Sequence, residues 1–124
     1  MFTVALFLLA AKHFVADLYL QAIYIKPSLK YLYFNFKSHM HYLHHAVLTA
    51  VIFLICFGWQ WAVLCFVIDY VTHWHTDWAK TSTARALGWT EQESRRGYWT
   101  LQTVDQILHF VVYFGMVLLA VCFR

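Results

Sequence analysis

Apolar residues are concentrated in four long stretches of the chain, and polar residues are gathered between them. Each stretch approaches the roughly 20 helical residues that are needed to cross the hydrocarbon core of a bilayer. A short connection without a charged side chain, Gly58-Trp59-Gln60-Trp61, makes the second and third stretches antiparallel neighbours. The pattern therefore predicts an all-α fold, a four-helix transmembrane bundle with helices over residues 2–25, 41–58, 60–80 and 98–123.

The connections between these helices differ in character. Pro27 follows the first helix and begins a segment rich in aromatic residues, which is typical of a chain that lies along a membrane surface. We expect a short interfacial helix starting at Pro27, between helices one and two. Residues 80–97 are polar and are expected to form the longest water-exposed loop. We expect residues 1–124 to form a single integral membrane domain.

Composition supports a membrane protein over a soluble one. Of the 124 residues, 62% are hydrophobic and 12% are charged, against roughly 45–50% and 25% in soluble domains. The net charge of +3 does not indicate nucleic-acid binding, because the basic residues flank the helices instead of forming a soluble patch. The three cysteines stand singly in apolar segments and are expected to be free thiols.

The distribution of lysine and arginine predicts an orientation. Segments 26–40 and 80–97 hold seven basic residues, and the opposite side has only Arg124 and the amino terminus. By the positive-inside rule these two segments are cytoplasmic and both termini are periplasmic. The first helix lacks a basic region before its apolar run, so we expect it to be retained and not removed as a signal peptide.

Polar residues within the helices follow a helical spacing. Residues four apart share one face of a helix, and this spacing recurs in the first and third helices, with a three- and four-residue spacing in the fourth. The three stripes are His13, Asp17 and Gln21; Asp69, His73 and Asp77; and Gln102, Asp105 and His109. The second helix instead crowds its histidines at one end, in His39-Met40-His41-Tyr42-Leu43-His44-His45.

The stripes also match in depth. Counted from the cytoplasmic end of each helix, His13, Asp69 and His109 lie at one level, eleven or twelve residues deep. A shallower layer holds Asp17, His73, Asp105 and either His44 or His45, and Gln21, His41 and Asp77 line the mouth. A charged side chain facing lipid near the bilayer centre costs at least ~2.5–3.5 kcal/mol. These residues therefore face inward, where they satisfy one another, a metal or water.

Imidazole and carboxylate together indicate a divalent metal, with zinc preferred and manganese or iron as alternatives. The candidate ligands are His13, His44, His45, His73 and His109. The candidate catalytic carboxylates, acting as further ligands, orienting groups or a general base, are Asp17, Asp69 and Asp105. Residues at the entrance or behind the ligands are Lys12, Gln21, His41, Asp77, Gln102 and Gln106. His39 and His75 fall off the stripes and are interpreted as helix-to-helix hydrogen-bonding groups.

Several of these segments together resemble a known family. The segments AKHFVADLYLQ, HYLHH, VIDYVTHWHTDWAK and LQTVDQILHF are similar to those of small phage and bacterial integral membrane proteins grouped as domain of unknown function 3307. The resemblance rests mainly on His13-x3-Asp17-x3-Gln21 and Asp105-Gln106-x2-His109, and includes His73, Asp77 and Lys80. It implies a multi-pass protein of a bacterial, or phage-host, inner membrane, and it implies no activity. Asp69 and the additional histidines of HYLHH go beyond the family pattern.

Three functions are compatible with these residues. The first is a membrane-embedded, metal-dependent hydrolase acting from the cytoplasmic side on a lipid or phosphorylated lipid. The second is a non-enzymatic phage or bacterial membrane factor, for envelope modification or superinfection exclusion, whose polar core is structural. The third is a di-iron membrane oxygenase, because His41-x2-His44-His45 is similar to one histidine box of such enzymes. The expected partner is membrane lipid and not nucleic acid, and the sequence leaves open whether the protein forms an oligomer.

Overall fold

The computed structural model describes residues 1–20 and 27–123, and the predicted all-α four-helix architecture is confirmed. Helix α1 spans Phe2–Phe14 and continues into a π-helical segment, η1, at Val15–Leu20. A short 3₁₀ helix, η2, follows at Pro27–Tyr31, where the sequence predicts an interfacial helix. The three longest helices are α3 at Phe36–Phe57, α4 at Trp59–Leu87 and α5 at Arg95–Cys122.

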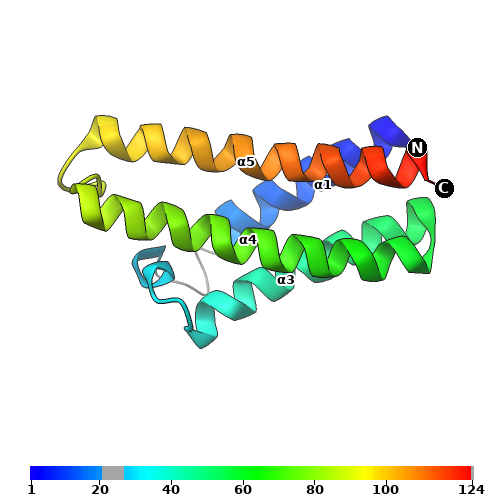
Figure 1. The fold of residues 1–124 in the computed structure, drawn as a ribbon, viewed down its shortest axis with the longest axis horizontal. Coiled ribbons are helices and arrows are strands. Elements are labelled where there is room, and N and C mark those ends of the chain that lie inside the picture. The colour runs from blue at the N-terminus through cyan, green and yellow to red at the C-terminus, as the bar shows by residue number, and fades with distance from the viewer. Residues whose placement is uncertain (21–26, 124) are drawn as a thin grey trace.

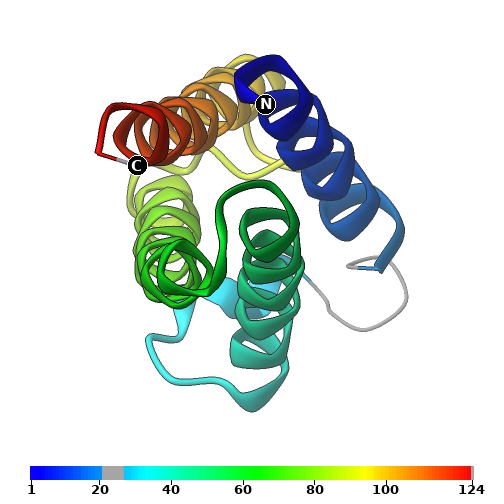
Figure 2. The ribbon, with the colours of Figure 1, turned by 90° about the vertical axis from the view of Figure 1, so that its right-hand side faces the viewer.

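The four helices surround a common axis, so that each contacts two neighbours. Helix α1 packs against α3 and α5, and α4 packs against the same two helices from the other side. Figure 2 shows this ring end-on, and Figure 1 shows α4 and α5 side by side along most of their length. The two termini lie at the same end of the bundle as the turn between α3 and α4 (Figure 1). Segments η2 and 88–94 lie toward the opposite end.

Three helical segments are long and apolar enough to cross a membrane: Phe2–Tyr19, Phe36–Phe57 and Arg95–Cys122. The sequence predicts a fourth span at 60–80, and α4 is not among the candidates within the described residues. Its length is ample, but polar residues from Asp69 onward lower the hydropathy of its second half. Asp69, His73 and Asp77 in this half are buried, so these polar side chains lie inside the bundle.

The helix boundaries differ from the predicted ones at the polar ends. Helix α3 begins at Phe36 instead of 41, because the side chain of Asn35 accepts a hydrogen bond from the Ser38 amide and caps the first turn. Helix α4 continues to Leu87, and Gly88 then ends it in a left-handed conformation. The predicted loop over 80–97 is therefore wrong in extent, since only residues 88–94 separate α4 from α5. The additional turns of both helices consist of polar residues that are compatible with a helix. They show no apolar periodicity, so the sequence pattern does not predict them.

The interior has an apolar half and a polar half. Near the termini the helices pack through Leu9, Phe53, Met116 and other apolar residues, which form one continuous core. Farther along the bundle the buried residues are mainly histidine, aspartate and lysine. The outside shows the reverse pattern: Phe7 is 72% exposed, whereas His73 is fully buried. Apolar side chains on the outside and charged ones inside are the arrangement expected for a bundle surrounded by lipid.

Candidate metal centre

The polar half of the bundle brings together side chains from all four helices. Asp17 comes from η1, His41 and His45 from α3, His73 and Asp77 from α4. Helix α5 adds Asp105 and His109, four residues apart on one face. The side chains of these residues are 3% exposed or less, except for that of Asp17, at 18%. Asp17 is thus the member of this group that is accessible from outside.

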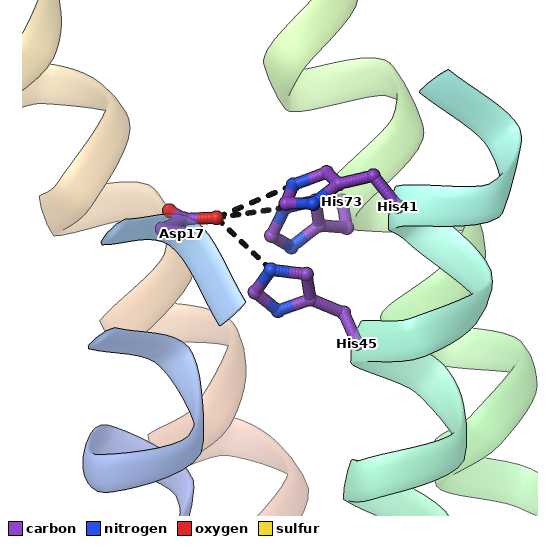
Figure 3. A group of neighbouring side chains, drawn as sticks. All are labelled: Asp17, His41, His45 and His73. Carbon is purple, nitrogen blue, oxygen red and sulfur yellow. Dashed lines mark hydrogen bonds and ion pairs between the residues drawn. The ribbon is translucent and has the colours of Figure 1, made fainter. Parts of the chain in front are cut away.

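Asp17 lies opposite three imidazoles. Its Oδ1 atom lies 2.9 Å from His45 Nε2, 3.3 Å from His41 Nε2 and 3.8 Å from His73 Nε2. Figure 3 shows the carboxylate pointing from the end of the first helix across to the rings on α3 and α4. Ligand atoms of these four residues all lie within 4.8 Å of one another, so the group can hold a metal ion. The π-helical segment that carries Asp17 is a kind of distortion often found at functional sites.

Buried nitrogen atoms in this group lack hydrogen-bond partners. Both ring nitrogens of His73 and the Nε2 atom of His41 make no hydrogen bond within the described part of the chain, although carboxylates lie nearby. A buried polar atom left unsatisfied costs about 1–3 kcal/mol. Imidazole nitrogens that converge without hydrogen bonds are therefore well suited to coordinate a cation.

Ring stacking holds the imidazoles in a row. The ring centroids of His45 and His73 lie 3.8 Å apart, and those of His73 and His109 lie 4.2 Å apart. His73 thus occupies the middle, and it belongs to a second group of potential ligands with His13 and His109. A third group consists of Asp77, Asp105 and His109. The three groups are continuous because they share His73 and His109.

His13 differs from the other cluster histidines because both of its nitrogens make hydrogen bonds. Nδ1 lies 2.9 Å from the hydroxyl of Tyr113, and Nε2 lies 3.0 Å from Gln106 Oε1. Nε2 is also 3.1 Å from Asp17 Oδ2, on the far side of that carboxylate from the α3 histidines. His13 is therefore placed to orient Asp17, as groups behind a metal ligand commonly do.

Each of the other buried carboxylates is paired with a lysine. Lys12 lies 2.8 Å from Asp69, Lys30 pairs with Asp77, and Lys80 lies 3.0 Å from Asp105. Asp17 has ion-pair contacts only with histidines within the described residues. It is thus the carboxylate whose charge is left for imidazolium or a metal to neutralise.

Most of the residues singled out in the sequence meet here, but their positions differ from the depth prediction. His41 and Asp77, expected at the mouth, are buried in the centre. His45, and not His44, faces the other ligands: His41 and His45 are four apart on one face, and His44 belongs to none of the three groups. Asp69, expected level with His13 and His109, instead bonds Lys12 and Thr49 and lies outside the three groups.

The remaining residues predicted for the entrance lie around the cluster. Gln106 contacts His13 and Asp105, and Gln102 accepts a hydrogen bond from Lys80. Lys12 is buried and acts as the countercharge to Asp69. Gln21 lies outside the described residues. His39 and His75 lie away from the cluster, against Tyr70 and Tyr33.

Two contributors were not identified from the sequence. Lys30 lies in segment 26–40, where it contributes only to the predicted orientation, yet it is 2% exposed and pairs with Asp77. Tyr113 lies in the apolar stretch of the fourth predicted helix, yet its hydroxyl bonds His13. The spacing of Tyr113 four residues after His109 was a usable signal, because it places the two on one face.

Comparison with known families agrees with the resemblance noted above. A family model described as "Protein of unknown function (DUF3307)" matches residues 4–123. The chain belongs to the DUF3307 family. The match covers all four helices and every member of the buried cluster, so the polar centre of this DUF3307 protein lies wholly within the family region. No curated protein and no solved structure gives a significant match.

Proposed function

We propose that this protein is a membrane-embedded, metal-dependent hydrolase, with its metal bound by Asp17, His41, His45 and His73. The observation that carries the proposal is the convergence of three imidazoles on one carboxylate oxygen, in a buried site where two of those rings have unsatisfied nitrogens. Three histidines and one carboxylate suit zinc, and also manganese or iron.

A divalent metal held there would acidify a bound water and polarise an oxygen of the substrate. Three aspartates near the metal position have different roles in such a reaction. Asp17 is the accessible member, with its side chain 18% exposed, so it faces the approaching substrate and can accept a proton. Asp105 is the second catalytic candidate, next to His109. Asp69 is bound to Lys12 and Thr49, so we assign it a positioning role.

Lipid is the proposed substrate. An open, apolar groove of about 610 Å³ runs along α5 from Trp99 to Phe114. Gln102 and Gln106 line it, and Gln106 also bonds His13. An apolar groove lined in part by polar groups fits an acyl chain whose headgroup approaches the metal. A lipid ester or a phosphorylated lipid meets this description.

We place the site in the cytoplasmic half of a bacterial inner membrane. The polar half of the bundle lies toward the same end as segments 27–40 and 80–97 (Figure 1). In the sequence, residues 26–40 and 80–97 carry seven of the nine basic residues. The positive-inside rule assigns that end to the cytoplasm and both termini to the periplasm. Helix α4 packs between α3 and α5, so it crosses the bilayer with them.

A second function is favoured by one observation. Three of the buried carboxylates have lysine partners, so much of the polar centre is already neutral without a metal. This fits a non-enzymatic phage or bacterial membrane factor whose ion pairs specify the fold.

The di-iron oxygenase interpretation has less support, because His44 of the His41-x2-His44-His45 motif does not join the cluster.

The decisive experiment is elemental analysis of the full chain purified in detergent, followed by hydrolysis assays on lipid esters and phospholipids in mixed micelles. We expect bound zinc, manganese or iron, with a lower metal content in His73→Gln and the wild-type content in His75→Gln. His75 is the matched control because it is on the same helix but outside the cluster. Helical content by circular dichroism establishes that both variants fold. Absence of metal from the wild-type protein, with retained fold, would support the structural role instead.

A further inference from the structure

We propose that Asp77, Asp105 and His109 form a second metal position beside the first, and that the carboxylate of Asp77 joins the two. This inference rests on the metal binding proposed above and extends it from one ion to two.

The atoms of the second position face one another. His109 Nε2 lies 3.4 Å from Asp77 Oδ1 and 3.4 Å from Asp105 Oδ1. All three residues are buried, and their ligand atoms lie within 4.8 Å of one another. Asp105 Oδ1 makes no hydrogen bond within residues 1–20 and 27–123. One imidazole nitrogen and two carboxylate oxygens form a donor set typical of first-row divalent metals.

Two lysines hold the carboxylates in this orientation. Lys30 bonds Asp77 through Oδ2, and Lys80 lies 3.0 Å from Asp105 Oδ2. In both residues the lysine bonds Oδ2, and the other oxygen, Oδ1, is directed at His109. Hydrogen-bond partners of a ligating carboxylate commonly fix its orientation.

Asp77 also reaches the first position. Its Oδ2 atom lies 3.5 Å from His73 Nε2 and 3.7 Å from His41 Nε2, which both belong to the Asp17 group. Its two oxygens therefore face ligands of different groups. Two-metal hydrolytic sites hold their ions about 3.5–4 Å apart, and a carboxylate shared between two groups suits that spacing.

The competing interpretation is an ion-pair network without a second metal. A protonated His109 between Asp77 and Asp105 would balance the same charges that a cation would. The two interpretations differ in how many metal ions the chain takes up and in which variants change that number.

The test is metal stoichiometry on the full chain in detergent, after chelator treatment, by calorimetric titration with Mn²⁺ and elemental analysis. We expect two equivalents for the wild-type chain and an exchange-coupled electron paramagnetic resonance spectrum of the Mn²⁺-loaded protein. Asp105→Asn is expected to bind one equivalent, with loss of the coupled signal. His41→Gln is also expected to bind one, and His75→Gln is the matched control that keeps two.

Lys80→Met separates the interpretations further. If Asp105 is a ligand, Lys80→Met changes the Mn²⁺ affinity of the second position, because the variant removes both a positive charge 3.0 Å from Asp105 and the hydrogen bond that orients its carboxylate. If Asp105 belongs only to an ion-pair network, Lys80→Met lowers the melting temperature and leaves Mn²⁺ binding unchanged.

The outcomes are distinguishable. One equivalent in the wild-type chain, unaffected by Asp105→Asn, overturns the second position and leaves the proposed function intact. No bound metal in the folded wild-type chain overturns both. Should Asp105→Asn fail to fold, Lys80→Met and the coupled spectrum of the wild-type chain still decide the question.

Discussion

Lys12 and Asp69 form a buried ion pair, Nζ to Oδ2 at 2.8 Å, next to the histidine cluster. Lys12 also donates to the backbone carbonyl of His45, and Thr49 donates to the same oxygen of Asp69. This pair connects α1, α3 and α4 at the level where the apolar core meets the polar centre. It is therefore placed to fix the position of His45 relative to the other ligands.

Breaking this pair is expected to be costly, whereas replacing both partners is not. Removing one partner of a buried ion pair typically costs about 3–5 kcal/mol, because the other charge is left uncompensated. We expect Lys12→Met and Asp69→Leu each to lower the unfolding free energy by about that amount. The double variant should recover most of the loss. The free energies of unfolding of the wild-type chain, the two single variants and the double variant are measured in mixed micelles by circular dichroism. If the loss in the double variant equals the sum of the two single losses, the two charges are independent.

Replacing His13 should weaken metal binding without abolishing it. Both nitrogens of His13 are hydrogen-bonded, and one orients Asp17. Loss of such a group behind a metal ligand usually costs about 10–100-fold in affinity. We expect His13→Gln to show a loss of that size in calorimetric titration with unchanged stoichiometry. A lower metal count in His13→Gln would instead make His13 a ligand, as the sequence suggests.

Two glycines of α5 should respond oppositely to alanine. A Cβ atom at Gly97 would lie 2.3 Å from the Trp89 ring, whereas one at Gly115 would meet nothing within 4 Å. We expect Gly97→Ala to lower the melting temperature, because the indole must move away. Gly115→Ala should be neutral or stabilise the protein by up to about 1 kcal/mol, through the higher helix propensity of alanine. Thermal unfolding of both variants is the measurement, and equal effects would contradict the packing at Gly97.

The proposed orientation predicts which loop is accessible from the cytoplasm. Glu91 is exposed in segment 88–94, between α4 and α5. In a background where the three native cysteines are replaced by serine or alanine, we expect Glu91→Cys to react with a membrane-impermeant maleimide only after the inner membrane is opened. A cysteine inserted directly after Met1 should react in spheroplasts. The opposite pattern would place the metal centre in the periplasmic half.

The sequence was most informative about helices and least informative about their ends. Apolar runs are local signals, so they predict the four helices and the burial of their polar stripes. The start of α3 at Phe36 and the end of α4 at Leu87 depend on capping by Asn35 and Gly88 and on polar helical turns. These turns have no apolar periodicity, which is why residues 80–87 were predicted to be a loop.

Counting residues from the cytoplasmic end of each helix correctly indicated which helices bring their polar residues together. It was less accurate about which side chains are in contact. It correctly brings His73 near Asp17, and His13 near His109, with ring centroids 4.9 Å apart. The count fails for Asp69, which was expected beside His13 and His109. Its carboxylate instead forms an ion pair with Lys12, whose long side chain extends from the neighbouring helix. It also fails for His41 and Asp77, since their depth depended on helix ends that the structure places farther out.

The sequence by itself determined that this chain forms apolar helices with histidine and aspartate on one face, because helical spacing and the cost of a charge in lipid are local constraints. Only the tertiary structure decided which of those groups converge. The rotation and axial offset of each helix select His45 over His44, bring Asp77 between two groups of ligands and pair each of three lysines with one carboxylate. Those quantities are set by packing among all four helices, and no single segment encodes them.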